Sequence, residues 1–146
     1  MKPASTITVD YSKSLAFMIR VCNFNWVDSD ITEEHFPKER SDGKANLHFE
    51  LVSYKKPMSS EAVLADFSTR KLRFATLLEG LHFVKKNPQA QRDAPIVILG
   101  SVWQLGNGIR RVPYLDGDSG GRGLDLGWFG GGWVEGVWFL AVRELA

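Results

Sequence analysis

The chain has few of the residues from which reactive and metal-binding sites are usually built. Cys22 is its single cysteine, which excludes an internal disulfide and a zinc site made of thiolates. The three histidines, His35, His48 and His82, lack the spacing of a metal-binding pair. We therefore expect no resident metal and no cofactor, and an enzyme is not the favoured class of protein.

An excess of one charge and long apolar segments are also missing. The 18 Lys and Arg against 17 Asp and Glu give a net charge of +1, which argues against charge-driven binding to nucleic acid or to anionic membranes. The apolar run at 15–19 stops at Arg20 and is too short for a signal peptide or a membrane span. The sequence predicts one globular domain, residues 1–146, in the cytoplasm and without membrane contact.

Glycine and tryptophan, by contrast, are concentrated in the C-terminal third. Twelve of the 14 glycines and three of the 5 tryptophans lie within 100–136. Glycine turns between apolar segments are typical of a twisted antiparallel meander. Its consecutive strands are expected at 95–104, 109–115, 124–129 and 137–143. Leu124, Leu126 and Trp128 should share one face of the third strand, and Pro113 should place the second strand at an edge or a bulge.

The first hundred residues predict mixed elements followed by two helices. We expect strands at 6–9 and around 47–51, and the run 96–99 reads as a central strand covered on both faces. A helix is expected at 12–22, with a strand at 15–21 as the alternative, and a capped single helical turn at 28–34.

The two helices give the clearest local signals. Ser59 or Ser60 should cap the first helix, and Thr76-Leu77-Leu78-Glu79 has the spacing of a capping box at the start of the second. The predicted fold class is therefore α+β: N-terminal mixed segments, two helices, and a C-terminal antiparallel meander of about four strands, with the helices packed on one face.

The C-terminal half of the chain resembles a group of small hypothetical bacterial proteins. The residues that carry the resemblance are Gly100-Ser101-Val102-Trp103, Arg111-Val112-Pro113, Arg122-Gly123-Leu124, Trp128-Phe129, Trp133 and Phe139-Leu140-Ala141-Val142-Arg143. The resemblance implies a small protein of bacterial type. The group has no assigned activity, so the resemblance implies no site residues.

Two motifs in and beside the polar loop at 116–123 resemble known catalytic and calcium-binding signatures. Each lacks the partner residues or repeats that its mechanism requires. Gly117-Asp118-Ser119-Gly120-Gly121 matches the nucleophile signature of serine proteases, but no histidine stands in a recognisable catalytic context. The segment 120–125 fits the start of a calcium-binding nonapeptide, to which Asp116, Asp118 and Asp125 could add ligands, but it occurs only once. A hydrolase that uses the loop 116–125 is one alternative function.

Residues 70–92 are locally basic and suggest a second alternative, a nucleic-acid-associated protein. The candidate phosphate contacts are Arg70, Lys71, Arg73, Lys85 and Lys86. A solvated helix face explains the same charges, and a basic pair suits the negative C-terminal end of a helix. Nucleic acid is therefore a partner that we do not favour.

The favoured function is a non-catalytic binding or interaction module with an aromatic, glycine-rich sheet surface. Trp103, Trp128 and Trp133 are the candidate ligand-binding residues, because exposed aromatic side chains often mark interaction sites. Trp133 stands between Gly132 and Val134 in a turn, so we expect it to be the exposed one. The partner would be a protein or a small molecule.

Overall fold

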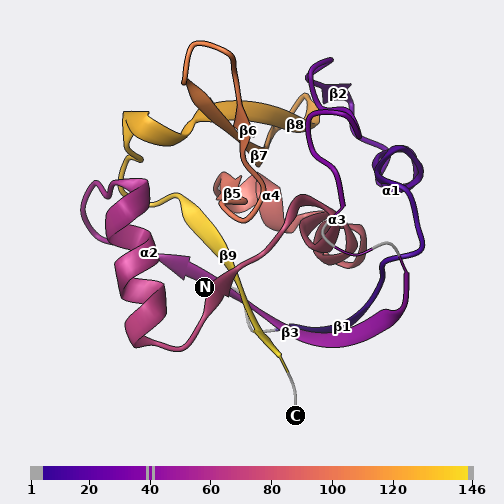
Figure 1. Cartoon of the computed structure of the whole chain (residues 1–146), viewed down its shortest axis with the longest axis horizontal. Helices are drawn as coiled ribbons and strands as arrows, with labels where there is room; N and C mark the ends of the chain where they lie inside the picture. Colours follow the sequence, from indigo (N-terminus) through magenta and orange to yellow (C-terminus); the bar gives the residue numbers. More distant parts are fainter. Residues whose placement is uncertain (1–4, 39, 41, 145–146) are drawn as a thin grey trace.

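The computed structural model describes residues 5–38, 40 and 42–144, which form an α+β fold with one mixed sheet (Figure 1). The predicted fold class is confirmed at this level. The first half contains β1 (Ser5–Asp10), α1 (Leu15–Val21), β2 (Trp26–Val27), β3 (Lys44–Ser53), α2 (Ser60–Thr69), β4 (Arg73–Phe74) and α3 (Leu77–Lys86). The second half contains α4 (Ala90–Asp93), β5 (Ile96–Val97), β6 (Trp103–Gln104), β7 (Arg110–Asp118), β8 (Gly121–Trp128), the 3-10 turn η1 (Phe129–Gly131) and β9 (Trp138–Glu144).

The order of strands corrects the predicted meander. Among the described residues the sheet runs β1-β3-β9-β5-β7-β8-β2, with β4 paired to β9 and β6 paired to β7. β6, β7 and β8 are antiparallel neighbours as expected, but β9 pairs antiparallel with β3 and parallel with β5. The physical reason is burial. Residues 139–142 place apolar side chains on both faces of the strand, and both faces are buried when the strand lies between two others with helices packed above and below it.

Three details of the predicted strands are also wrong. The segment 95–104 forms two separate strands, β5 and β6, and the supposed loop at 116–123 is mostly strand, since β7 and β8 leave a two-residue turn at Ser119 and Gly120. Of the two positions predicted for Pro113, the edge is wrong, because Pro113 lies inside the sheet in register with Leu126 of β8. On its other side β7 pairs with β5 from Tyr114 onward and with β6 up to Arg111, so the strand pairing is interrupted at Pro113, where a residue without an N–H is tolerated.

The helices lie on opposite faces of the sheet, where one common face was expected. Figure 1 shows the sheet curling around α3, with α1 on the same inner side and α2 on the outer side. Burial along β9 follows this division, because Leu140 and Val142 join the core under α3 whereas Phe139 and Ala141 join the core under α2. The run 96–99 alternates in the same way, which confirms the prediction of a strand covered on both faces.

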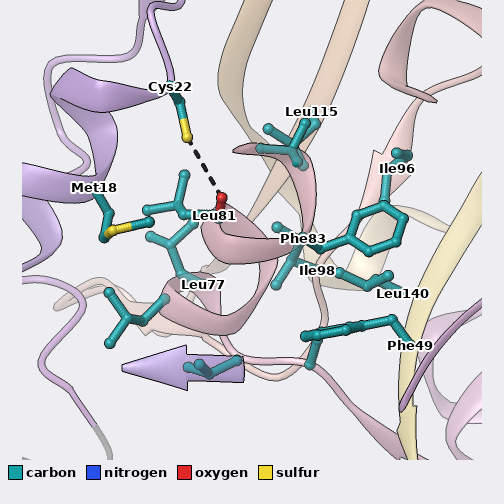
Figure 2. Close-up of a cluster of buried hydrophobic side chains, with 14 of the residues drawn as sticks. Met18, Cys22, Phe49, Leu77, Leu81, Phe83, Ile96, Ile98, Leu115 and Leu140 are labelled. Carbon is teal, nitrogen blue, oxygen red and sulfur yellow. Dashed lines mark hydrogen bonds between the residues drawn. The ribbon is translucent and has the colours of Figure 1, made fainter. Parts of the chain in front are cut away.

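Helix α3 is the centre of the larger core. All eight residues from Leu77 to Val84 are buried, and the predicted capping box is formed by Thr76 and Glu79. Figure 2 shows Leu77 and Leu81 pointing towards Met18 of α1, while Phe83 extends towards Ile96. The Cys22 thiol donates to Leu81 O at 3.5 Å, and burial raises its pKa to about 11 (Figure 2). The lone cysteine is therefore a protonated core residue.

The segment before β3 agrees with the prediction in part. The helix predicted at 12–22 is present as α1, and its cap is Ser14, whose Oγ accepts from Phe17 N at 3.0 Å. The capped single helical turn predicted at 28–34 lies later, at 32–36: Phe36 N donates to Thr32 O, and the Thr32 hydroxyl accepts from His35 N. Residues 28–31 form a tighter turn in which Ile31 N donates to Asp28 O.

Candidate functional site

The structure divides the three candidate tryptophans between two faces of the β6-β7-β8 hairpins. Trp103 and Trp128 are both register partners of Arg111, so the three side chains form a row on one face. Trp133 lies over the opposite face, where a Cβ on Gly127 would come within 3.0 Å of its ring. The absence of a side chain at residue 127 thus lets the edge of the Trp133 indole pack against the sheet there.

Two of these tryptophans are partly core residues. Trp103 stacks on His35 with ring centroids 3.8 Å apart. Trp133 donates its indole N–H to Ser60 Oγ at 3.0 Å and meets Phe139 edge-on. Trp133 is therefore half-buried, and the expectation that it would be the exposed tryptophan was wrong: Trp128 is the open one, with 57% of its surface exposed.

A shallow groove of about 410 Å³ lies between the η1 turn and the start of α2. Trp128 does not line it, but the Trp128 ring lies on Gly130 and Gly131, which do. It is lined by Pro57, Met58, Ser59, Gly130, Gly131, Gly132, Trp133 and Val134. Met58 and Trp133 hold its two sides together by a pair of backbone hydrogen bonds of 3.0 and 2.8 Å.

The same turn carries the most exposed apolar groups of the described chain. Val134 is 71% exposed, and the Trp128 ring rests on the backbone of Gly130 and Gly131, where added Cβ atoms would lie 3.2 and 2.8 Å from it. We call the residues Trp128, Gly130, Gly131, Trp133 and Val134 the tryptophan surface. The sequence identified the two tryptophans but not Val134, whose neighbours Trp133 and Glu135 give only a weak signal of exposure.

The basic residues of 70–92 do not meet at one place. Arg70 forms an ion pair of 3.1 Å with Asp66, whereas Arg73 pairs with Glu79 at the start of α3. Lys85 and Lys86 are exposed at the other end of α3, a helix of ten residues and hence about 15 Å long. Nucleic-acid contact through these residues stays a prediction, and the geometry does not strengthen it.

Sequence reasoning missed that Arg73 belongs to a buried polar cluster. Glu79 is 3% exposed, and both its carboxylate oxygens accept from Arg73 at 2.9 Å. Tyr11 donates its hydroxyl to the same carboxylate at 2.5 Å, and Thr76 N donates at 2.9 Å. Burial raises the pKa of Glu79, but these hydrogen bonds outweigh it and hold that pKa below its usual value. The cluster ties β1, β4 and α3 together, and the capping box was its one sequence signal.

The hydrolase alternative gains no catalytic neighbours from the structure. Ser119 is exposed in the β7-β8 turn, and no hydrogen bond between described residues joins it to a histidine. His82 is buried on α3 with both ring nitrogens engaged, since Nδ1 meets Leu78 O at 2.9 Å and Nε2 accepts from Asp10 N. Burial lowers its pKa, so His82 is a neutral structural residue.

The aspartates of the same hairpin form a pair instead of a cation site. Burial and the neighbouring Asp125 carboxylate raise the pKa of Asp116 to about 6. Asp125 in turn accepts the indole N–H of Trp26 at 2.9 Å, while Asp118 accepts from Gly120 N in the turn. Within the described part of the chain, no group of three or more His, Cys, Asp and Glu side chains could hold a metal ion.

No family model, curated protein or solved structure matches the chain, so the resemblance to small bacterial proteins stays a prediction. None of the helices in the described residues has the length and apolar character needed to cross a membrane.

Proposed function

We propose that the chain is a non-catalytic interaction module that binds a partner protein through the tryptophan surface. The observation that carries the proposal is the exposure of Trp128 and Val134 on either side of the η1 turn, next to a groove with mostly apolar walls. Contiguous exposed apolar surface in a folded protein often marks an interaction site.

The shape of the groove favours a protein over a small molecule. Small-molecule sites enclose most of their ligand, whereas this groove is shallow and open along the glycine turn. Its composition, with tryptophan, methionine and a neighbouring arginine, is that of the centre of a protein interface. The two hydrogen bonds between Met58 and Trp133 hold the groove in place before a partner arrives.

The chemistry of the surface defines the partner segment. Val134, Met58 and Trp133 offer apolar contact for one inserted aliphatic or aromatic side chain. Arg111 lies in register with Trp128, on the face opposite Trp133, so a carboxylate of a segment that continues over the η1 turn would meet a guanidinium beside the Trp128 indole. The proposed ligand is therefore an apolar peptide segment with an acidic neighbour.

A random-peptide phage library panned on the immobilised full chain tests this proposal. Peptides that are selected should contain an apolar residue next to Asp or Glu, and Trp128→Ser should weaken their binding about tenfold, as for a residue at the centre of an interface. Leu64→Ser is the control, because Leu64 is an exposed apolar residue of α2 that does not line the groove. Equal binding to wild type and Trp128→Ser, or no selected peptide at all, would contradict the proposal.

A further inference from the structure

A second and larger groove, of about 540 Å³, lies between α1 and the segment 26–33. In Figure 1, α1 and β2 are on the right of the view, away from α2 and the tryptophan surface. The floor of the groove is apolar and is built by Leu15, Ala16 and Ile19 of α1 together with Val27 and Ile31 of the facing segment. Ala16 and Val27 are exposed, so a ligand in the groove would cover apolar surface that water now contacts.

The wall of this groove opposite α1 is fixed by contacts with the sheet and the core. The segment that holds Val27 is bonded to β8, since Asn25 N donates to Arg122 O at 2.8 Å and Asp28 N donates to Leu124 O at 2.9 Å. The following turn is anchored in the main core by Ile31 and Phe36, which are 6% and 5% exposed. Helix α1, the other wall, is held by its buried residues Leu15 and Met18. The groove is therefore formed in the free protein, and a ligand does not have to order its walls.

The rim of the groove is strongly acidic on one side. Residues 28–34 contain four carboxylates, Asp28, Asp30, Glu33 and Glu34, and no Lys or Arg occurs from residue 21 to residue 34. Asp28 and Glu33 line the groove itself. Arg20 stands on the α1 side, where its guanidinium lies 5.4 Å from the centre of the Phe17 ring of the same helix.

From this combination we infer that the groove binds a cationic amphipathic helical segment of a partner protein. An apolar stripe of the segment fills the space above Ala16 and Ile19, as in other recognition modes that place a helix in a groove. Lys or Arg side chains beside the stripe reach the carboxylates of 28–34, which gives charge complementarity and a binding constant that falls with salt. This site is independent of the tryptophan surface. Arg111 beside Trp128 favours an acidic ligand there, whereas the carboxylates of 28–34 favour a basic ligand here.

Two synthetic helical peptides test the inference. One has a stripe of leucines flanked by lysines, and the other carries glutamate in place of every lysine. In NMR titrations of the full chain, the lysine peptide should shift the amide signals of residues 15–20 and 26–33, whereas the glutamate peptide should not bind. Raising the salt concentration should weaken the lysine peptide.

Matched variants separate the apolar and the electrostatic parts of this site. Ala16→Gln places a larger neutral side chain on the groove floor and should weaken the lysine peptide about tenfold, whereas Ala65→Gln, an exposed alanine of α2, should leave its affinity unchanged. Asp28→Asn with Glu33→Gln should also weaken binding and reduce the salt dependence. The asparagine can still accept the hydrogen bond that Asp30 N donates to residue 28, so the turn is retained.

Three results would overturn the inference. The first is equal binding of the two peptides, and the second is a set of shifted signals outside the groove. The third is self-association of the free chain in sedimentation equilibrium that Ala16→Gln abolishes, because the occupant would then be a second copy. Variants Trp128→Ser and Val134→Ser should leave the lysine peptide unaffected, so failure here and failure of the tryptophan surface are distinguishable.

Discussion

Helix α3 and the turn from Trp128 to Val134 use apolar residues in opposite ways. Every residue from Leu77 to Val84 is buried, including a glutamate and a histidine. In the turn, Trp128 and Val134 remain largely exposed, although Phe129 between them is buried. The fold buries apolar side chains completely where they stabilise it. The comparison therefore separates apolar residues that stabilise the core from apolar residues that a partner could contact. Four variants measure that separation.

The largest effect is expected from Leu81→Ala. Leu81 is fully buried at the centre of α3, and truncation of such a leucine removes packing and leaves a cavity, at a cost of about 2–5 kcal/mol of unfolding free energy. Urea denaturation measures the change. Leu64→Ala, at a position that is half-exposed, is the matched control and should cost less than about 0.5 kcal/mol. A loss below that value for Leu81→Ala would show that α3 is not the core helix described here.

Arg73→Met should have the next largest effect. It leaves the buried Glu79 carboxylate without its bidentate partner, while Tyr11 and Thr76 still donate to it. Because Arg73 is 40% exposed, we expect about 2 kcal/mol, below the range for a fully buried pair. Arg70→Met breaks the exposed pair with Asp66 and should change the unfolding free energy by less than about 0.5 kcal/mol. Equal effects of the two substitutions would contradict a special role for the Glu79 cluster.

A smaller effect, with a definite pH dependence, is expected at the hairpin that leads into the turn. The pKa of Asp116 is about 6 in the folded chain against a usual value of 3.8, so the folded state binds more protons than the unfolded state between these values. The contribution of Asp116 to stability is therefore greatest at low pH and is lost as the pH rises from about 4 to about 6. The difference in Tm between wild type and Asp116→Asn should fall over that interval. Asp118→Asn, in the exposed turn, is the control, and a difference for Asp116→Asn that does not vary with pH would contradict the assignment.

The smallest effect on stability is expected from Trp128→Ser. Its ring is largely exposed and covers two glycines at the surface, so thermal unfolding should change by less than about 0.5 kcal/mol in free energy. Trp133→Ser should be clearly more destabilising, because it removes the hydrogen bond to Ser60 and the contact with Phe139. Similar losses for the two variants would remove the distinction between a core tryptophan and an interaction tryptophan.

Local signals were enough for the parts of the fold that local contacts determine. The capping box at Thr76 and the glycine turn between β6 and β7 depend on residues within a few positions of each other, and both were predicted correctly. The place of β9 in the sheet was not predicted, because the residues of β3 that pair with it lie 85 to 97 positions earlier and no short pattern encodes that pairing.

The candidate site shows the same limit. Tryptophan content and glycine turns pointed to Trp128 and Trp133 together, since composition alone does not tell which ring is covered. The burial of Trp133 depends on Ser60, which is 73 residues away in the chain. The groove at α1 was missed for a related reason: its apolar floor exists only where residues of α1 and of the segment 27–33 face each other in the fold.

The position of β9 also has a consequence for the order in which the sheet can close. The strands β1 and β3 on one side, and β5, β7 and β8 on the other, are joined through β9, which follows all of them in the sequence. Until β9 docks, β3 and β5 each have an edge without the partner that they have in the folded chain, and such edges favour aggregation. Docking of β9 is therefore the step that turns two separate groups of strands into one sheet. A chain truncated after residue 137 should accordingly stay sensitive to protease, whereas the chain that includes β9 should be resistant.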